Sequence, residues 1–261
     1  MSRIKDITDY LDELFPKETA EDYDNPGLMT GKRDQKVTGV VLSLDATSGA
    51  IMKCKQTGSN LLLTHHPLIF GGIDTVCEED TNGLLLSAMI RNDITCYAAH
   101  TNLDKNSEYS NFVLARKLGA VPESVRELEG TSCGAYFELP SAVALGEYMK
   151  TIRDALDCSG VISINNAGNT FRKVFVQGGA FDEDSIPSVR DSGAELVVSG
   201  EIKHHVTLLL AHMGILSVIA GHNATERVFV ENLMTVLQEK FKDVPFYYDE
   251  GHEHNIDFMV K

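Results

Sequence analysis

The chain has 261 residues, of which 43% are hydrophobic and 23% charged. These proportions are ordinary for a globular protein, and the length allows one large domain or two smaller ones. The 38 acidic and 23 basic residues give a formal charge of −15. Because no Lys/Arg run offsets this charge, the surface repels phosphate groups, and we expect no nucleic-acid partner.

The segment from Met1 to Phe15 predicts an amphipathic surface helix, with Ile4, Ile7, Leu11 and Leu14 at helical spacing among charged residues. This is not the pattern of a signal peptide, and no apolar run approaches the roughly 18 residues of a membrane span. The 5 cysteines are scattered without a Cys-x-x-Cys pair, which indicates reduced and mostly buried thiols. We therefore expect a cytoplasmic protein with no membrane partner.

The first half of the chain alternates strands and helices. A turn at Tyr23 to Gly27 comes first, and Asp45 to Ser48 offer a helix N-cap. The expected elements are a strand at Val37 to Leu44, a helix at Gly49 to Gln56, a strand at Leu61 to Leu63, a helix near Leu84 to Arg91 and a strand at Thr95 to Ala99. Their nearly continuous apolar strands predict a sheet that is covered on both faces.

The second half repeats this order. Residues 193–201 match residues 58–66 in character, position for position. Around them we expect a strand at Val174 to Gln177, a helix at Asp182 to Asp191, a helix at Val206 to His212 and a strand at Ile215 to Ala220. The chain is therefore interpreted as an α/β protein with a duplicated α-β motif and mixed or parallel sheets.

A second lobe is expected to open between the two copies, with its boundary near Glu129 and Gly130. The segment from Ser132 predicts a strand at Gly134 to Leu139, a helix at Ala142 to Leu156 and a strand at Gly160 to Ile164. The last helix, Thr225 to Phe241, turns Val228, Leu233, Val236 and Leu237 inward and precedes a final strand. The predicted division is a metal-binding lobe of residues 1–129 plus 218–261 and a second lobe of residues 130–217.

Two segments carry the same chemical pattern, an apolar run that ends in a histidine and is followed four residues later by a carboxylate. They are His100 with Asp104 and His222 with Glu226, and a third segment ends in His65 and His66. Imidazole and carboxylate bind divalent transition metals, and parallel strands deliver their C-terminal ends to one edge of a sheet. These six side chains can therefore converge on two metal ions, with Asp104 and Glu226 free to bridge.

A two-metal cluster of this kind stays cationic, attracts an anionic substrate and activates water as a bridging hydroxide. Nitrogen and oxygen ligands suit Zn, Fe, Mn, Co or Ni, without choosing among them. Structural roles are the alternative: neighbouring histidines on an extended strand point to opposite faces, and Glu226 also suits a helix start. Glu201, which aligns with His66, is either a general base or substrate ligand or a solvated helix start.

The remaining polar candidates have weaker signals. One of His204 and His205 can point back toward the site, whereas His212 is expected on a helix surface. His252, Glu253 and His254 resemble a metal-binding pattern, but we favour a solvated turn there. Tyr23 to Leu28 either cap a binding cleft or close a loop. No dinucleotide fingerprint, P-loop or Gly-x-Ser-x-Gly motif is present, which argues against those enzyme classes.

Together these segments resemble the Nif-three-like dinuclear-metal-centre family, whose members are often named GTP cyclohydrolase I type 2 homologues. The resemblance is carried by Tyr23 to Leu28, Leu63 to Phe70, His100 to Asp104, Ser199 to Lys203 and Gly221 to Glu226. It implies a fold of two intertwined lobes, a homohexameric ring and two divalent ions per subunit. It also implies that the metal ligands are His65, His66, Asp104, His222 and Glu226, with His100 a ligand or a close neighbour.

The functional hypothesis is a metal-dependent hydrolase that acts on a small anionic, nucleotide-like substrate. The resemblance implies hydrolytic opening of the imidazole ring of GTP. Metal-dependent phosphoester cleavage is the alternative among hydrolases. A ring that binds metal and serves protein partners as a regulatory or scaffolding module is the alternative from another class.

Overall fold

The computed structural model describes residues 1–250, so the predicted turn at His252 to His254 lies outside the described residues. The chain forms two compact units. The first contains Met1–Leu103 and the segment that begins at Val230, and the second contains Asp104–Phe229. Each unit is built around its own sheet.

The sheet of the first unit has the strand order β1-β4-β3-β2-β9. Strands β2, β3, β4 and β9 are parallel to their neighbours, whereas the edge strand β1 runs antiparallel to β4. Parallel strands buried on both faces favour continuous apolar runs, and Leu61, Leu62 and Leu63 are all buried. The strands span β1 Gly27–Thr30, β2 Val40–Ser43, β3 Leu61–Thr64, β4 Thr95–Ala98 and β9 Phe246–Tyr248.

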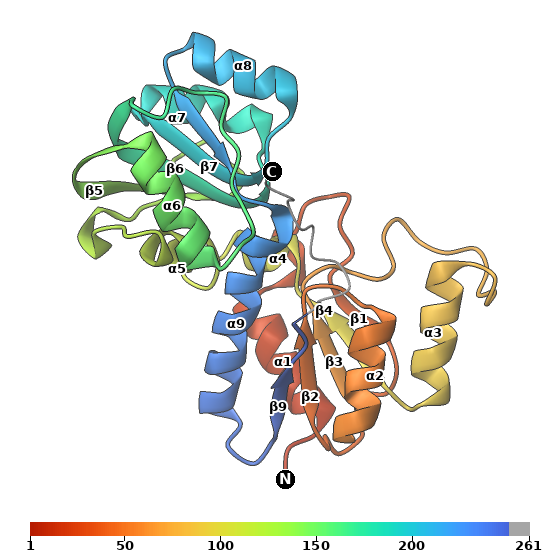
Figure 1. The fold of residues 1–261 in the computed structure, drawn as a ribbon. Helices are drawn as coiled ribbons and strands as arrows, with labels where there is room; N and C mark the ends of the chain where they lie inside the picture. The colour runs from red at the N-terminus through yellow and green to blue at the C-terminus, as the bar shows by residue number, and fades with distance from the viewer. Residues whose placement is uncertain (251–261) are drawn as a thin grey trace. The chain divides into compact units, whose positions relative to one another are not determined.

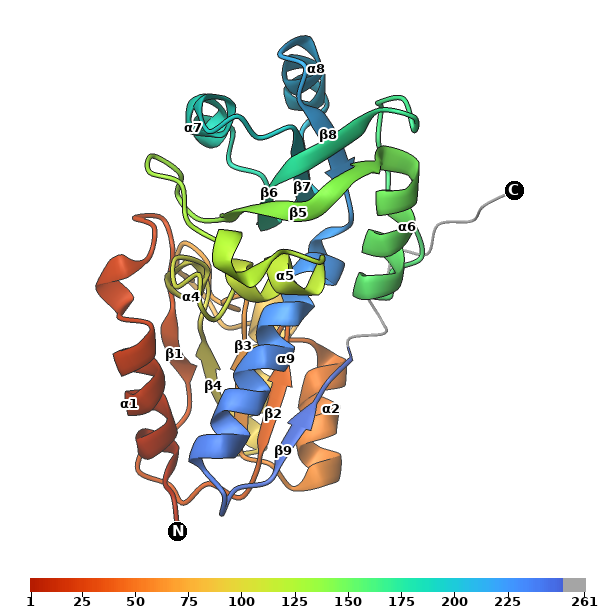
Figure 2. The same ribbon diagram turned by 90° about the vertical axis from the view of Figure 1, so that its left-hand side faces the viewer.

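Helices cover both faces of this sheet (Figures 1 and 2). Helices α2 (Ser48–Thr57) and α3 (Thr81–Arg91) lie on one face, where Cys54 and Met89 pack against Leu62 and Cys96. Helix α1 (Ile4–Leu14) and the part of α9 (His222–Lys240) that follows Val230 lie on the other face. Helix α1 buries the apolar stripe that the sequence predicts, and α2 ends at Gly58 in the left-handed conformation.

The sheet of the second unit has the order β5-β6-β7-β8, with β5 antiparallel to β6 and the other pairs parallel. Helices α5 and α6 cover one face, and α7 and α8 cover the other (Figure 2). Phe175 and Val197 form the core beneath α7 and α8. The elements span α5 Asn111–Lys117, β5 Ala135–Ala144, α6 Leu145–Leu156, β6 Thr170–Ala180, α7 Ile186–Asp191, β7 Leu196–Glu201, α8 His204–His212 and β8 Leu216–Ile219.

The duplication predicted from the sequence is present in the fold. The order β2-α2-β3-α3-β4 in the first unit recurs as β6-α7-β7-α8-β8 in the second. In both copies the middle strand pairs in parallel with the strands on either side. The protein therefore has a mixed α/β fold with two mixed sheets covered by helices.

One predicted strand is wrong. In Gly160 to Ile164, only Ile162 forms an isolated bridge, with Ile219 of β8. Asn165 explains why no ladder continues, because its side-chain oxygen accepts the backbone N–H of Ser217 in place of a strand partner. Helix α5, which was not predicted, packs against β5 and β6.

The compact units divide the chain at positions other than the predicted lobe boundaries. Residues 104–129, expected in the metal-binding lobe, belong to the second unit, because α5 packs on its sheet. Residues 218–229 also belong there, since β8 pairs with β7 and the first turns of α9 contact Gly178 and Gly200. Among residues 1–250, no helix is both long and apolar enough to cross a bilayer.

Candidate metal centre

Polar side chains follow the strands of the first sheet at one edge. His65 and His66 come directly after β3, and His100 comes shortly after β4. The backbone N–H of His100 donates to Oδ1 of Asn102 at 2.9 Å, and Nδ2 of Asn102 donates to the carbonyl of Phe15 at 2.7 Å. These bonds fix the chain where it leaves β4.

The three histidines form one cluster. One nitrogen from each of His65, His66 and His100 lies within 4.8 Å of the others. The ring centroids of His65 are 5.0 Å from His66 and 5.2 Å from His100, and those of His66 and His100 are 5.4 Å apart. Adjacent histidines do not diverge here, because β3 ends at Thr64 and the Thr64 hydroxyl donates to the carbonyl of His66 at 2.8 Å, closing a bend.

Each imidazole of this cluster has an acceptor oxygen at Nδ1. Nδ1 of His65 lies 2.9 Å from the carbonyl of Ala99, Nδ1 of His66 lies 2.7 Å from Asp45, and Nδ1 of His100 lies 2.8 Å from Asp24. An acceptor at this position holds the hydrogen on Nδ1 and leaves the lone pair on Nε2. Such outer partners orient histidines that bind metals and raise their basicity.

Asp24 is the most shielded of these partners, with a side chain that is 0% exposed. Burial raises the pKa of Asp24, but the hydrogen bonds from His100 and Thr101 outweigh it and hold that pKa well below its usual range. Asp24 is therefore a carboxylate that faces His100 and the start of helix α4 (Thr101–Asp104). A carboxylate behind an imidazole strengthens that imidazole as a metal ligand.

A pocket of about 570 Å³ lies beside His66 in the first unit. Apolar side chains, among them Leu68 and Leu85, line part of it, and Thr47 and Thr81 contribute hydroxyl groups. Its size is in the range of pockets that hold small molecules. The pocket beside His66, a candidate metal ligand, is therefore large enough for a small molecule.

The second unit carries a histidine with two glutamates around it. Nε2 of His222 lies 2.9 Å from Oε2 of Glu226, and Nδ1 lies 3.1 Å from Oε1 of Glu201. The Glu226 side chain is 6% exposed, whereas that of Glu201 is 64% exposed. His222 begins α9 and Glu226 lies one turn further along, so the spacing of four residues places both on one face of the helix.

Glycines bring the start of α9 close to the ends of β6 and β7. A Cβ on Gly179 would lie 2.1 Å from Oε1 of Glu226, and one on Gly200 would lie 2.7 Å from Cα of His222. Gly200 stands where the first copy has His65. The difference between the two copies therefore has a steric reason, since the second copy has no space for a side chain there.

Asp104 and Glu226 both belong to the second unit, and, besides burial, the negative charges of both raise the pKa of the Cys133 thiol. Burial, followed by the charge of Asp104, raises the pKa of Cys133 far above the usual thiol value. Cys133 therefore stays protonated, and Nε2 of Gln177 donates to its sulfur at 3.4 Å.

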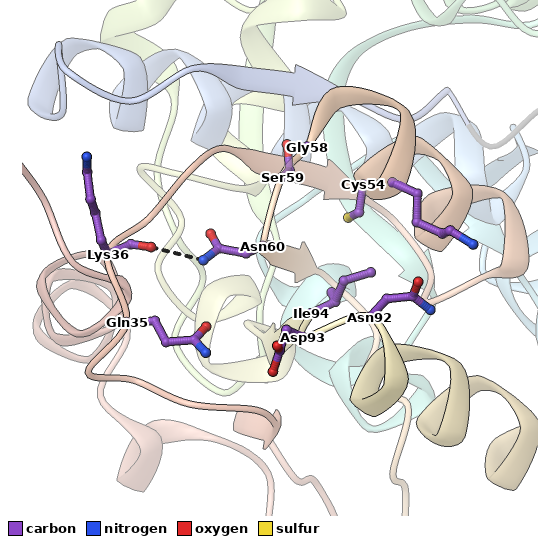
Figure 3. Close-up of a pocket in the computed structure, with 10 residues that line it drawn as sticks. Gln35, Lys36, Cys54, Gly58, Ser59, Asn60, Asn92, Asp93 and Ile94 are labelled. Atoms are coloured by element: carbon purple, nitrogen blue, oxygen red, sulfur yellow. Dashed lines mark hydrogen bonds between the residues drawn. The ribbon is translucent and has the colours of Figure 1, made fainter.

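The other histidines of residues 1–250 are surface groups. Nε2 of His205 lies 3.0 Å from Glu183, and His204 and His212 are exposed on α8. A further pocket of about 640 Å³ lies at the opposite edge of the first sheet, where β3 and β4 begin (Figure 3). Its lining includes Lys36 and Asn60, joined by a hydrogen bond of 2.9 Å, and it contains no histidine.

The sequence analysis missed the roles of Asp24 and Asp45. The predicted N-cap segment Asp45 to Ser48 does cap α2, through Thr47, whereas Asp45 bonds to His66. The strand-end rule that selected the histidines also applies to Asp45, which follows β2. Asp24 precedes β1. Because β1 runs antiparallel to β4, the start of β1 lies at the same end of the sheet as the C-terminal ends of the parallel strands.

Comparison with known proteins identifies the family. A family model described as Duf34/NIF3 (NGG1p interacting factor 3) matches residues 2–251. The chain belongs to the Duf34/NIF3 family. A relative from Clostridium perfringens, named GTP cyclohydrolase 1 type 2 homolog, is 27% identical over 263 residues, covering 98% of this chain and 100% of the relative. A Streptomyces coelicolor relative of the same name is 29% identical and covers 87% of this chain and 82% of its own length.

Solved structures share the Duf34/NIF3 fold. A hypothetical protein from Staphylococcus aureus aligns with a TM-score of 0.88 at 24% identity, over 98% of this chain and 99% of that chain. A Bacillus cereus protein related to NIF3 aligns with a TM-score of 0.87 at 20% identity, over 99% of both chains. At these identities the likeness concerns the fold.

Proposed function

We propose that this Duf34/NIF3 protein is a divalent-metal-dependent hydrolase acting on a small anionic, nucleotide-like substrate. The observation that carries the proposal is the cluster of His65, His66 and His100, whose Nδ1 atoms all face acceptor oxygens. The name shared by the relatives, GTP cyclohydrolase 1 type 2 homolog, supports opening of the GTP imidazole ring as the reaction.

The residues present fit a divalent transition metal. Three imidazoles with lone pairs on Nε2 form a nitrogen donor set that suits Zn, Fe, Mn, Co or Ni. The separation of 2.9 Å between His222 Nε2 and Glu226 Oε2 also fits one ion, because bonds of about 2.0 to 2.2 Å place neighbouring ligands about 3 Å apart. Both groups of side chains are therefore chemically suited to hold metal.

The outer carboxylates prepare the ligands for this role. Asp24 and Asp45 hold the Nδ1 hydrogens of His100 and His66, and Glu201 faces Nδ1 of His222. Each contact fixes the rotation of an imidazole ring before any metal binds. A divalent ion held there supplies Lewis acidity and lowers the pKa of water that it binds.

The finer parts of the proposal come from the sequence motifs and from what the family resemblance implies. They are two divalent ions per subunit with Asp104, His222 and Glu226 among the ligands, a homohexamer, and a cytoplasmic location. Metal analysis of protein purified without chelator tests the first and should give two ions per chain. Mass photometry tests the second and should give six times the chain mass of 28.7 kDa.

The activity is tested by incubating metal-replete protein with GTP and measuring formate. We expect metal-dependent release of formate, abolished in His100→Ala and Asp104→Ala and unchanged in His212→Ala, an exposed histidine on α8. Release of phosphate or a nucleoside in place of formate would show that the reaction is phosphoester cleavage and not ring opening. Absence of metal-dependent turnover across a pool of nucleotides would contradict the hydrolase and favour a regulatory or scaffolding role.

A further inference from the structure

Two exposed aromatic side chains border the histidine cluster. Tyr23 is 63% exposed and Phe70 is 53% exposed. Their ring centroids are 6.0 Å apart, and the Phe70 ring lies 6.2 Å from the ring of His100. The pair therefore stands next to a candidate metal ligand and faces solvent.

Hydrogen bonds fix the backbone that carries both rings. On one side of Tyr23, the N–H of Glu21 donates to Thr101 at 2.9 Å. On the other side, Asp24 bonds to His100, and Nδ2 of Asn25 donates to the carbonyl of Ile69 at 2.8 Å, directly before Phe70. Because the loops that carry the two rings are already anchored, little conformational entropy is lost when a ligand binds to them.

The angles between the rings suit stacking by a third ring. Phe70 meets His100 at 74° and Tyr23 at 53°, so neither neighbour lies parallel to the Phe70 ring. Aromatic faces that stand in solvent stack with planar rings, and each stacked base contributes substantially to binding. Single exposed apolar side chains are common on protein surfaces, whereas two adjacent exposed aromatic rings beside a cluster of candidate metal ligands indicate a binding site.

We propose that Tyr23 and Phe70 form a platform for a planar heteroaromatic ring of the substrate, which stacks on the face of Phe70, meets the inclined ring of Tyr23 at its edge and lies beside His100. This inference rests on the proposed function, because it assumes that the substrate reacts at the histidine cluster. The platform recognises the flat face of the ring, so the ring, more than the sugar or phosphate, determines affinity.

Isothermal titration calorimetry of the metal-replete protein tests this, with GMP as the probe and ribose 5-phosphate as the matched probe without the ring. We expect GMP to bind at least about tenfold more tightly than ribose 5-phosphate. Phe70→Leu and Tyr23→Leu should each weaken GMP binding by about tenfold and leave ribose 5-phosphate binding unchanged. Phe70→Tyr, which keeps an aromatic face, should bind GMP like the unaltered protein.

Ile90→Ala is the control for loss of an exposed apolar side chain, since Ile90 is 60% exposed at the end of α3. Metal content should be the same in all variants. Equal affinities for the two probes, no binding of GMP, or unchanged GMP affinity in both leucine variants would overturn the platform. GMP binding as expected with no metal-dependent turnover of any nucleotide would reject the hydrolase alone. Turnover of GTP that neither leucine variant alters would reject the platform alone.

Discussion

Asp24 accepts a hydrogen bond from Nδ1 of His100 at 2.8 Å, although 76 residues separate the two in the chain. The same carboxylate accepts the N–H and the hydroxyl of Thr101. One buried group thus orients an imidazole of the histidine cluster and holds the start of α4. Such an arrangement prepares a ligand before metal arrives.

Replacing this carboxylate should weaken metal binding. In Asp24→Asn the amide keeps a similar shape but lacks the negative charge that strengthens His100 as a ligand. We expect affinity for Zn²⁺ to fall by about 10-fold to 100-fold. Competition with a chromophoric chelator measures the affinity, and Asp22→Asn, at an exposed position nearby, should bind as the unaltered protein does. Equal affinities in the two variants would show that Asp24 has no part in metal binding.

Gly200→Ala should destabilise the second unit. The added Cβ would lie 2.7 Å from the carbonyl oxygen of Gly179 and from Cα of His222, and backbone atoms cannot rotate away. We expect the free energy of unfolding in urea to fall by about 1 to 3 kcal/mol. Gly168→Ala is the matched control. The nearest atom to the Cβ added at Gly168, at 3.3 Å, belongs to the side chain of Asn166 and not to the backbone. A loss no larger than that of the control would refute the steric account of Gly200.

Thiol accessibility separates the cysteines, none of which forms a disulfide within residues 1–250. Cys77 is exposed, Cys54 and Cys96 are buried, and Cys133 and Cys158 are partly buried. The sequence predicts mostly buried thiols, but only two of the five are fully buried. An Ellman assay of the native protein should show a fast phase that disappears in Cys77→Ser. Persistence of that phase would mean that a cysteine other than Cys77 is open to the reagent.

Alkaline pH should weaken the core of the first unit through its buried thiols. Burial raises the pKa of Cys54 and of Cys96 to about 12. The unfolded chain loses these protons near pH 8.5, so the stability that the neutral thiols provide is complete below that pH and is lost as the pH rises toward 12. The urea midpoint should therefore fall less between pH 8 and pH 10.5 in Cys96→Ala than in Cys77→Ala. The same fall in both variants would contradict this assignment.

Much of the site follows from where strands end. The apolar runs that form β3 and β4 placed His65, His66 and His100 at one edge of a sheet, and the structure confirms that they lie together. The duplication was likewise readable, because residues 58–66 and 193–201 share their pattern. These features depend on local periodicity and on the geometry of parallel strands, which the sequence carries directly.

The remaining features depend on contacts between distant residues. The sequence cannot show that Asp24 meets His100, because the contact requires β1 to pair antiparallel with β4. The segment around Ile162 has the composition of a strand, but the Asn165 side chain takes the place of the next strand partner at Ser217. A side-chain hydrogen bond that takes the place of a hydrogen bond between strands leaves no periodic pattern in the sequence.

Anomalous X-ray diffraction from crystals of protein purified without chelator would locate the metal, with data collected on both sides of the absorption edge of the element identified by elemental analysis. We expect an anomalous peak about 2.0 to 2.2 Å from Nε2 of His65, His66 or His100, absent in crystals of a His65→Ala, His100→Ala variant. Metal bound at full occupancy elsewhere, with no peak at these three nitrogens, would contradict this expectation.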